Sequence, residues 1–199
     1  FGLRGYNDFW IDPGSNLALV KGEFRTSYVI DPENGRVPRL ETPKVQIQRS
    51  FGARYVTGEG NADGPEALPL AERCFIGFGN TAGPGMMGTL YNSTYQFVQT
   101  DDYFTILVEM NHDARIIPLY DSAQEARAHA RPAELNQWFG DSRGWYEDGW
   151  LVVETININP QQIAESSVPI TADGVITERF MRYSDTEIVY QFTVDDDNL

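Results

Sequence analysis

The hairpin that does most to decide the fold is Trp138-Phe-Gly-Asp-Ser-Arg-Gly-Trp-Tyr-Glu-Asp-Gly-Trp-Leu-Val-Val-Glu-Thr155. Asp148-Gly149 lies between two runs rich in aromatic and β-branched residues, and it predicts a type I′ turn, in which both central residues need a positive φ. With that turn, alternation along the two strands places four residues on one face: Arg143, Trp145, Val152 and Glu154. Arg143 lies opposite Glu154, so the two charges are expected to neutralise each other across the hairpin.

Two further hairpins extend this pattern. The predicted strands 94–100 and 103–110 flank Asp101-Asp102, and this register puts five apolar residues on one face: Tyr95, Phe97, Phe104, Ile106 and Val108. The predicted strands 175–183 and 186–194 flank Ser184-Asp185. Their register sets Arg179 opposite Tyr190 on an apolar face, with Glu178 on the other face. Arg179 is therefore expected to point into the core.

Successive hairpins with one apolar face predict a mainly β fold in a single domain, 1–199. The expected architecture is an antiparallel hairpin meander that closes into a lipocalin-like (calycin-like) barrel or a two-layer sandwich, with one or two short helices. Two stretches interrupt the meander: a Gly/Pro-rich loop at 57–93 and a short helical insertion at 120–138. A loop as long as 57–93 is usually functional or mobile in a compact domain.

Composition excludes several classes of partner. The 199 residues carry a net charge of −14, and the isoelectric point is near 4.4, so phosphates of nucleic acids would be repelled. No apolar run approaches the roughly 20 residues of a membrane-spanning helix. Cys74 is the only cysteine, so no internal disulfide can form. The chain begins at Phe1 without a methionine, as expected if a signal peptide has been removed or an N-terminus lies outside it.

Arginines on the predicted inner face are candidates for ligand binding. A buried guanidinium needs a partner, because an unpaired buried charge costs several kcal/mol or more. Grouped at a barrel mouth, such side chains would orient a carboxylate, a phosphate or an enolate. The alternative is a structural network of ion pairs, which is favoured for Arg143 with Glu154. The candidate ligand-binding residues are Tyr95, Arg115, Arg143, Arg179 and Tyr190.

Candidate catalytic residues are fewer. Glu109 and His112 are three apart on a strand that enters a turn, so they point to opposite faces and do not form a helical metal motif. His112 could act as a general base with Asp113 or Glu109 orienting it, although a turn histidine bonded to the backbone is the commoner case. For a pair of carboxylates in acid/base chemistry, Asp141 with Glu154 or Glu109 is the best placed. No metal and no cofactor are expected.

Several phrases are specific enough for comparison with known families: Tyr6-Asn-Asp-Phe-Trp10, Glu72-Arg73-Cys74, Glu109-Met-Asn-His-Asp-Ala-Arg-Ile-Ile-Pro118, Gly140-Asp-Ser-Arg-Gly-Trp145 and Glu178-Arg-Phe180. They resemble a large family of exported bacterial proteins whose reaction is not established. The resemblance covers nearly the whole chain. It implies a signal peptide, a secreted or periplasmic location and a β-rich fold. Relatives have a short turn where this chain has 120–131, and they continue past 192–196 into a Pro-Trp segment.

Three functional hypotheses follow. The leading one is an exported β-barrel that binds a small, partly apolar, anionic molecule in its interior. The alternative is an enzyme that uses the same cavity for acid/base chemistry of the isomerase, lyase or hydrolase type. The third is a structural or assembly protein whose exposed aromatic residues contact another chain. A perturbed histidine or glutamate in a pocket would favour catalysis, whereas a filled barrel with apolar patches outside would favour assembly.

Overall fold

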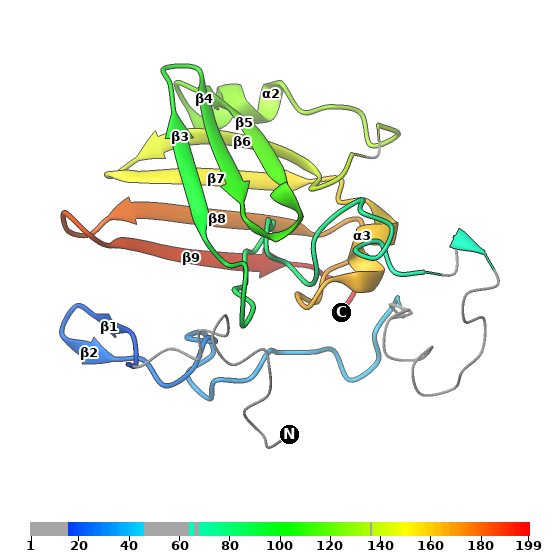
Figure 1. Ribbon diagram of the computed structural model, residues 1–199, viewed down its shortest axis with the longest axis horizontal. Helices are drawn as coiled ribbons and strands as arrows, with labels where there is room; N and C mark the ends of the chain where they lie inside the picture. The colour runs from blue at the N-terminus through cyan, green and yellow to red at the C-terminus, as the bar shows by residue number, and fades with distance from the viewer. Residues whose placement is uncertain (1–15, 46–63, 66–67, 136) are drawn as a thin grey trace.

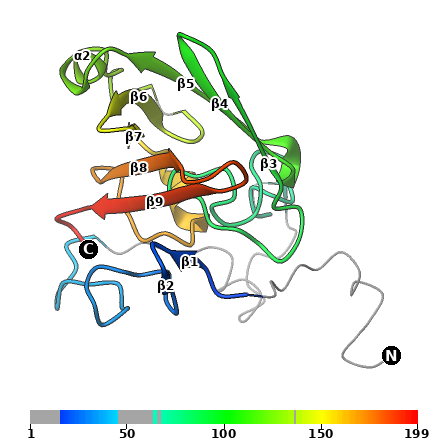
Figure 2. The same cartoon turned by 90° about the vertical axis from the view of Figure 1, so that its left-hand side faces the viewer.

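The computed structural model describes residues 16–45, 64–65, 68–135 and 137–199. Its main feature is a seven-stranded sheet that curls into a half-barrel (Figures 1 and 2). The strands follow one another across the sheet in chain order: β3 (Tyr95–Gln99), β4 (Tyr103–Val108), β5 (Ala114–Tyr120), β6 (Asp141–Glu147), β7 (Trp150–Ile156), β8 (Val175–Arg182) and β9 (Ile188–Asp195). Two short strands, β1 (Leu19–Val20) and β2 (Glu23–Phe24), form a separate small sheet.

The mainly β prediction is confirmed, and so are the registers of two hairpins. Tyr95 lies opposite Val108, as the Asp101-Asp102 turn predicts, and the five predicted apolar residues all face the core. Glu147 lies opposite Trp150, with φ of 50° at Asp148 and 81° at Gly149. These registers could be predicted because a two-residue turn leaves little freedom in how its flanking strands pair.

The register predicted for the last hairpin is wrong by one residue. The connection is longer than a two-residue turn, since the N–H groups of Tyr183 and Ser184 both donate to the carbonyl of Glu187. As a result Phe180, and not Arg179, lies opposite Tyr190. A slip of one residue moves every side chain of a strand to the other face. Arg179 therefore faces outward and Glu178 faces the core, the reverse of the expectation.

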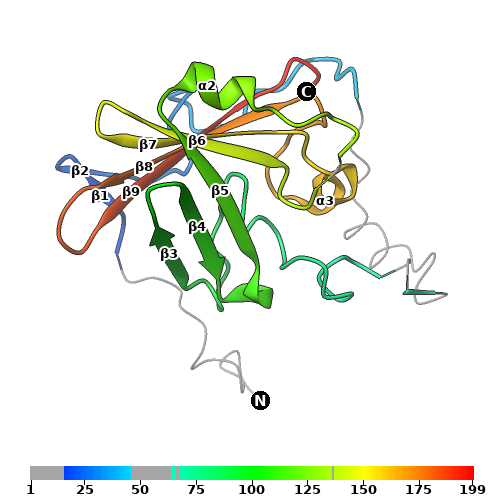
Figure 3. The ribbon, with the colours of Figure 1, turned by 90° about the horizontal axis from the view of Figure 1, so that it is seen from above.

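β5 and β6 form the one parallel pair among the described strands, with Leu119 opposite Gly144. The predicted insertion 120–138 carries α2 (Ala123–Ala128), whose first turn is capped by the Ser122 hydroxyl accepting from the Glu125 N–H at 3.2 Å. Ala126 packs against Trp145 and Val152, so α2 covers the outer face of β6 and β7 (Figure 3).

A second helix, α3 (Pro160–Glu165), lies in a stretch that shows no helical pattern in the sequence. Its start has two local causes. The Asn159 side chain accepts from the Gln161 N–H at 2.9 Å, and Pro160 suits the first turn because it lacks the N–H that would otherwise be unsatisfied. α3 lies at one end of the half-barrel, on the side of the chain's last residues (Figure 1).

The core fills the concave side of the half-barrel. Most of it comes from β4, β5, β7, β8 and the turn after β4: Phe104, Ile106, Val108, Met110, Ile117, Leu151, Val153 and Phe180. Ala82 and Met86 of the predicted 57–93 loop complete this cluster. Within the described part of that loop, residues 80–86 are buried. The glycine-rich segment 80–87, here called the plug segment, thus belongs to the core. No helix of the described residues is long and apolar enough to cross a bilayer.

Candidate functional site

A buried ion pair lies at the centre of the concave face. Arg115 comes from β5 and Glu178 from β8, and strand alternation turns both side chains inward. Two parallel hydrogen bonds join them, at 2.5 Å between Nη2 and Oε2 and 3.1 Å between Nη1 and Oε1. Their side chains are 2% and 0% exposed. This fork geometry is the strongest pairing available to an arginine and a carboxylate.

Three hydroxyl groups complete the ion pair. Tyr190 of β9 donates to Glu178 Oε1 at 2.8 Å, and Arg115 Nη2 donates to the Ser142 hydroxyl at 3.1 Å. The Ser142 and Thr155 hydroxyls are 2.8 Å apart. Burial, and then the negative charge of Glu178, raise the pKa of the Tyr190 hydroxyl far above its usual range. Tyr190 is therefore a fixed hydrogen-bond donor and not an acid at ordinary pH.

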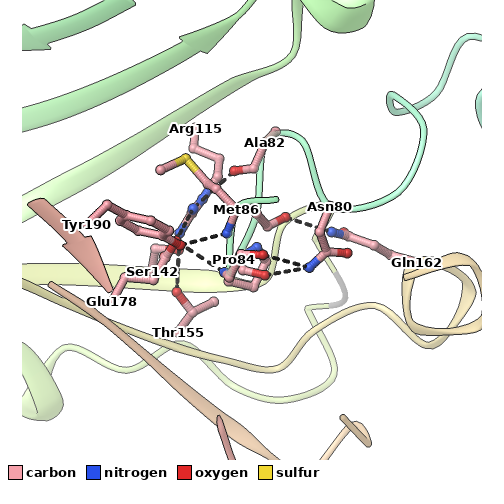
Figure 4. A network of polar contacts seen from close by, with 12 residues as sticks. Asn80, Ala82, Pro84, Met86, Arg115, Ser142, Thr155, Gln162, Glu178 and Tyr190 are labelled. Atoms are coloured by element: carbon pink, nitrogen blue, oxygen red, sulfur yellow. Dashed lines mark hydrogen bonds and ion pairs between the residues drawn. The ribbon is translucent and has the colours of Figure 1, made fainter. Parts of the chain in front are cut away.

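The same side chains hold the backbone of the plug segment (Figure 4). Arg115 Nη1 donates to the Ala82 carbonyl at 3.0 Å. Glu178 Oε1 accepts from the Gly85 N–H at 3.1 Å, and the Tyr190 oxygen accepts from the Met86 N–H at 2.6 Å. Further bonds come from outside the ion pair: Tyr95 donates to the Thr81 carbonyl at 2.8 Å and Gln162 to the Gly83 carbonyl at 3.0 Å.

Glycine is required where the plug segment crosses the ion pair. Gly83 has φ of +87°, and a Cβ atom there would lie 2.4 Å from Arg115 Nη1. A Cβ at Gly85 would meet the Phe192 ring at 3.2 Å. The Gly-Pro-Gly sequence is thus explained by a close approach of backbone to side chains.

The ion pair of Arg115 and Glu178 has little remaining capacity to bind a ligand. The Arg115 charge is neutralised by Glu178, and the donors of the guanidinium are used except for Nε, which has no hydrogen-bond partner. A neighbouring space has no volume that a water molecule could enter, and it is lined by Asn80, Pro84, Ile158, Gln162, Ser166, Ile170 and Ile176. In this state the concave face binds the protein's own chain.

A second buried arginine lies on the opposite face of the sheet, under α2. Arg143 is 1% exposed, and its nearest charged neighbour is Asp141, with Oδ2 at 3.7 Å from Nη1. None of the three guanidinium nitrogens makes a hydrogen bond, and neither does the Trp145 indole nitrogen. The prediction that Glu154 neutralises Arg143 is wrong. Glu154 instead accepts from Arg127 of α2, at 2.7 Å.

The candidate catalytic residues Glu109 and His112 lie at the tight turn between β4 and β5. The turn is a short 3₁₀ segment, Met110–His112, with positive φ at Asn111 and His112. Glu109 Oε2 accepts from the Thr94 N–H at 3.3 Å. Asp113 accepts from the Gly77 N–H and from Asn111, which offset part of the rise in its pKa caused by burial. Both carboxylates are thus used by groups other than the His112 ring.

The structure therefore divides the predicted residues into three groups. Tyr95, Arg115 and Tyr190 meet around the plug segment. Glu109 and His112 lie at the turn after β4. Asp141, Arg143, Glu154 and Arg179 lie on the outer face of the sheet. Glu178 was not predicted as a core residue, although Ile176, Glu178 and Phe180 alternate in a way that could have indicated it.

Another feature lies on the convex side of β3, β4 and β5. The outward positions of these strands carry no charged side chain, and we call this set the convex patch: Gln96, Val98, Tyr103, Thr105, Leu107, Ala114, Ile116 and Pro118. Four of its apolar side chains are substantially exposed, Val98 by 46%, Tyr103 by 48%, Leu107 by 37% and Ile116 by 67%.

Comparisons of the chain with protein-family models, curated proteins and solved structures found no match. The resemblance to exported bacterial proteins therefore stays a prediction. Among the described residues, no three His, Cys, Asp or Glu side chains are grouped so that they could hold a metal ion.

Proposed function

We propose that this protein is an assembly or protein-binding module, and that the convex patch is its contact surface. The observation that supports the proposal is a contrast between the two faces of one sheet. The concave face is filled by the plug segment, whereas the convex patch leaves apolar side chains exposed. No charged residue occurs between Arg73 and Asp101, in a chain with 22% charged residues. Exposed apolar groupings of this kind mark protein interaction sites.

The composition of the convex patch also favours a protein contact. Interfaces are depleted of charge at their centre and carry polar groups at their rim. The patch has an uncharged centre, and exposed acidic residues border it, with Asp101 and Asp102 at one end of β3 and Glu109 at the other. An anionic membrane surface would be repelled by this rim.

Position-specific photo-crosslinking in the native host tests the proposal. A benzophenone amino acid at Ile116 is expected to capture one partner, which mass spectrometry of the crosslinked band identifies. The same amino acid at Arg182, which lies far along the sheet and is also exposed, serves as the control. A Leu107→Glu change should abolish the crosslink at Ile116. Equal capture at both positions, or capture that survives Leu107→Glu, would contradict the proposal.

Binding of a small anionic molecule inside the half-barrel is a second proposal. It is favoured by the polar groups of the concave face and by the unpartnered Arg115 Nε. The plug segment occupies this space, so a ligand would have to displace it. Native mass spectrometry of protein purified from its own host tests this proposal, because a retained molecule would appear as added mass. Export from the cytoplasm and the enzyme alternative stay predictions.

A further inference from the structure

The outer edge of β3 has no partner strand among the described residues, so backbone groups on that edge are available for pairing. In an antiparallel pair, alternate residues exchange hydrogen bonds with the partner strand. The Glu109 N–H donates to the Thr94 carbonyl, and the Thr100 N–H donates to the Tyr103 carbonyl. Even-numbered residues of β3 therefore bond to β4, and odd-numbered residues direct their N–H and C=O groups away from it. These outward residues are Tyr95, Phe97 and Gln99, and no other described strand pairs with this edge.

The sequence of β3 also lacks the residues that usually protect an edge strand. Natural proteins place lysine, proline or a bulge on such strands to prevent pairing with another chain. β3 has the sequence Tyr-Gln-Phe-Val-Gln and regular pairing over its whole length. Its side chains are the ones that a partner strand would meet, with Val98 on the convex side and Phe97 towards the core. Such an edge is suited to the addition of an extended segment.

The charges at the two ends of β3 indicate what kind of segment would bind. Asp101 and Asp102 are exposed after the strand, and Glu109 is exposed beside its first residues, joined to Thr94. A second copy of β3 would bring carboxylates against carboxylates at both ends, whichever way it ran. Basic residues would instead be attracted at both ends, and the net charge of −14 would speed their approach.

We infer that the open edge of β3 binds an extended segment of a partner protein, with alternating apolar residues at its centre and lysine or arginine at both ends. The inference rests on the proposed function, because the convex patch then belongs to the same interface. Backbone pairing with Tyr95, Phe97 and Gln99 supplies the affinity, and the acidic ends select the partner. The added strand would extend the half-barrel on the side of β3.

The test is a titration with a labelled peptide of alternating valine and threonine that carries two lysines at each end. Fluorescence anisotropy measures the binding. The peptide should bind the wild-type protein. Replacing its lysines with glutamates should weaken binding by about tenfold or more. Raising the salt from about 50 mM to about 500 mM should also weaken it. Equal affinity for both peptides would overturn the assignment of a basic partner.

Variants of the protein locate the binding site. Gln99→Pro removes an outward N–H without removing a bond to β4, so it should abolish peptide binding and leave the fold intact. Gln99→Thr keeps the N–H and is the matched control. Asp101→Asn combined with Asp102→Asn should weaken binding of the lysine peptide but not that of the glutamate peptide. Binding that is unchanged in Gln99→Pro would overturn the inference.

Two outcomes separate this inference from the proposed function. If crosslinking at Ile116 captures a partner and Gln99→Pro leaves that capture unchanged, the convex patch is an interface but the edge is not its binding mode. If sedimentation shows a dimer of this chain that Gln99→Pro dissociates, the occupant is a second copy and the basic partner is overturned. If the peptide binds and no partner is captured at Ile116, the β3 edge is a binding site, and the proposal that the convex patch is a contact surface is contradicted.

Discussion

Arg115 and Arg143 are both almost fully buried, on opposite faces of one sheet, but their surroundings differ. Arg115 is 3% exposed and holds Glu178 in a two-bond fork. Arg143 is 1% exposed, makes no hydrogen bond and has Asp141 at 3.7 Å. Burial alone therefore does not say whether an arginine stabilises a fold. The partner decides this, since a buried charge is costly unless it is paired and hydrogen-bonded.

The largest expected loss of stability is at Glu178. Glu178→Gln leaves the Arg115 charge buried without a carboxylate, and it should lower the free energy of unfolding by about 3–5 kcal/mol. Urea denaturation at neutral pH measures this loss. The double variant Arg115→Met with Glu178→Leu removes both charges and should lose less than Glu178→Gln alone. A loss below about 1 kcal/mol in Glu178→Gln would contradict the role given to the ion pair.

A smaller effect is expected where the plug segment crosses Arg115. Gly83→Ala adds a Cβ that would meet Arg115 Nη1, at a residue with φ of +87°. Gly149→Ala is the matched control, because its φ is +81° and nothing lies within 4 Å of the added atom. Both variants are strained, but Gly83→Ala should lose about 1–3 kcal/mol more, owing to the clash. Equal losses in denaturation would show that the segment can move away from Arg115.

Tyr190 should have a modest effect that depends on pH. Tyr190→Phe removes the bonds to Glu178 and to the Met86 N–H and should cost about 1–3 kcal/mol at neutral pH. The folded protein raises the pKa of Tyr190 above its ordinary value of 10.0. Above pH 10 the unfolded chain therefore loses a proton that the folded chain keeps, and wild-type stability falls as the pH rises. Denaturation curves at pH 8 and above pH 10 should show a smaller fall for Tyr190→Phe than for the wild type.

The smallest effect is expected at Arg143. Arg143→Met removes donors that make no hydrogen bond, and it keeps the apolar part of the side chain under α2. The free energy of unfolding should therefore stay within about 1 kcal/mol of the wild type or rise. A loss as large as that of Glu178→Gln would show that the two arginines are equivalent, and the contrast between them would be lost.

Some elements could be predicted because their causes are local. The Asp148-Gly149 turn determines the pairing from Arg143–Glu154 to Glu147–Trp150, and Ser122 determines the start of α2. The last hairpin could not be placed in the same way. Its turn, with Glu187 accepting two N–H groups, has no two-residue signature, and an error of one residue exchanged Arg179 for Glu178. The partner of Arg115 was missed for this reason.

The sequence by itself determined the mainly β character, two hairpin registers and the inward position of Tyr95, Arg115 and Tyr190, because alternation and turn chemistry act over a few residues. Only the tertiary structure decided what those residues bind. The plug segment has no periodic pattern, and its place depends on side chains from strands far apart along the chain: Tyr95, Arg115, Glu178 and Tyr190. The open edge of β3 likewise exists only because of where the neighbouring strands end up in the sheet.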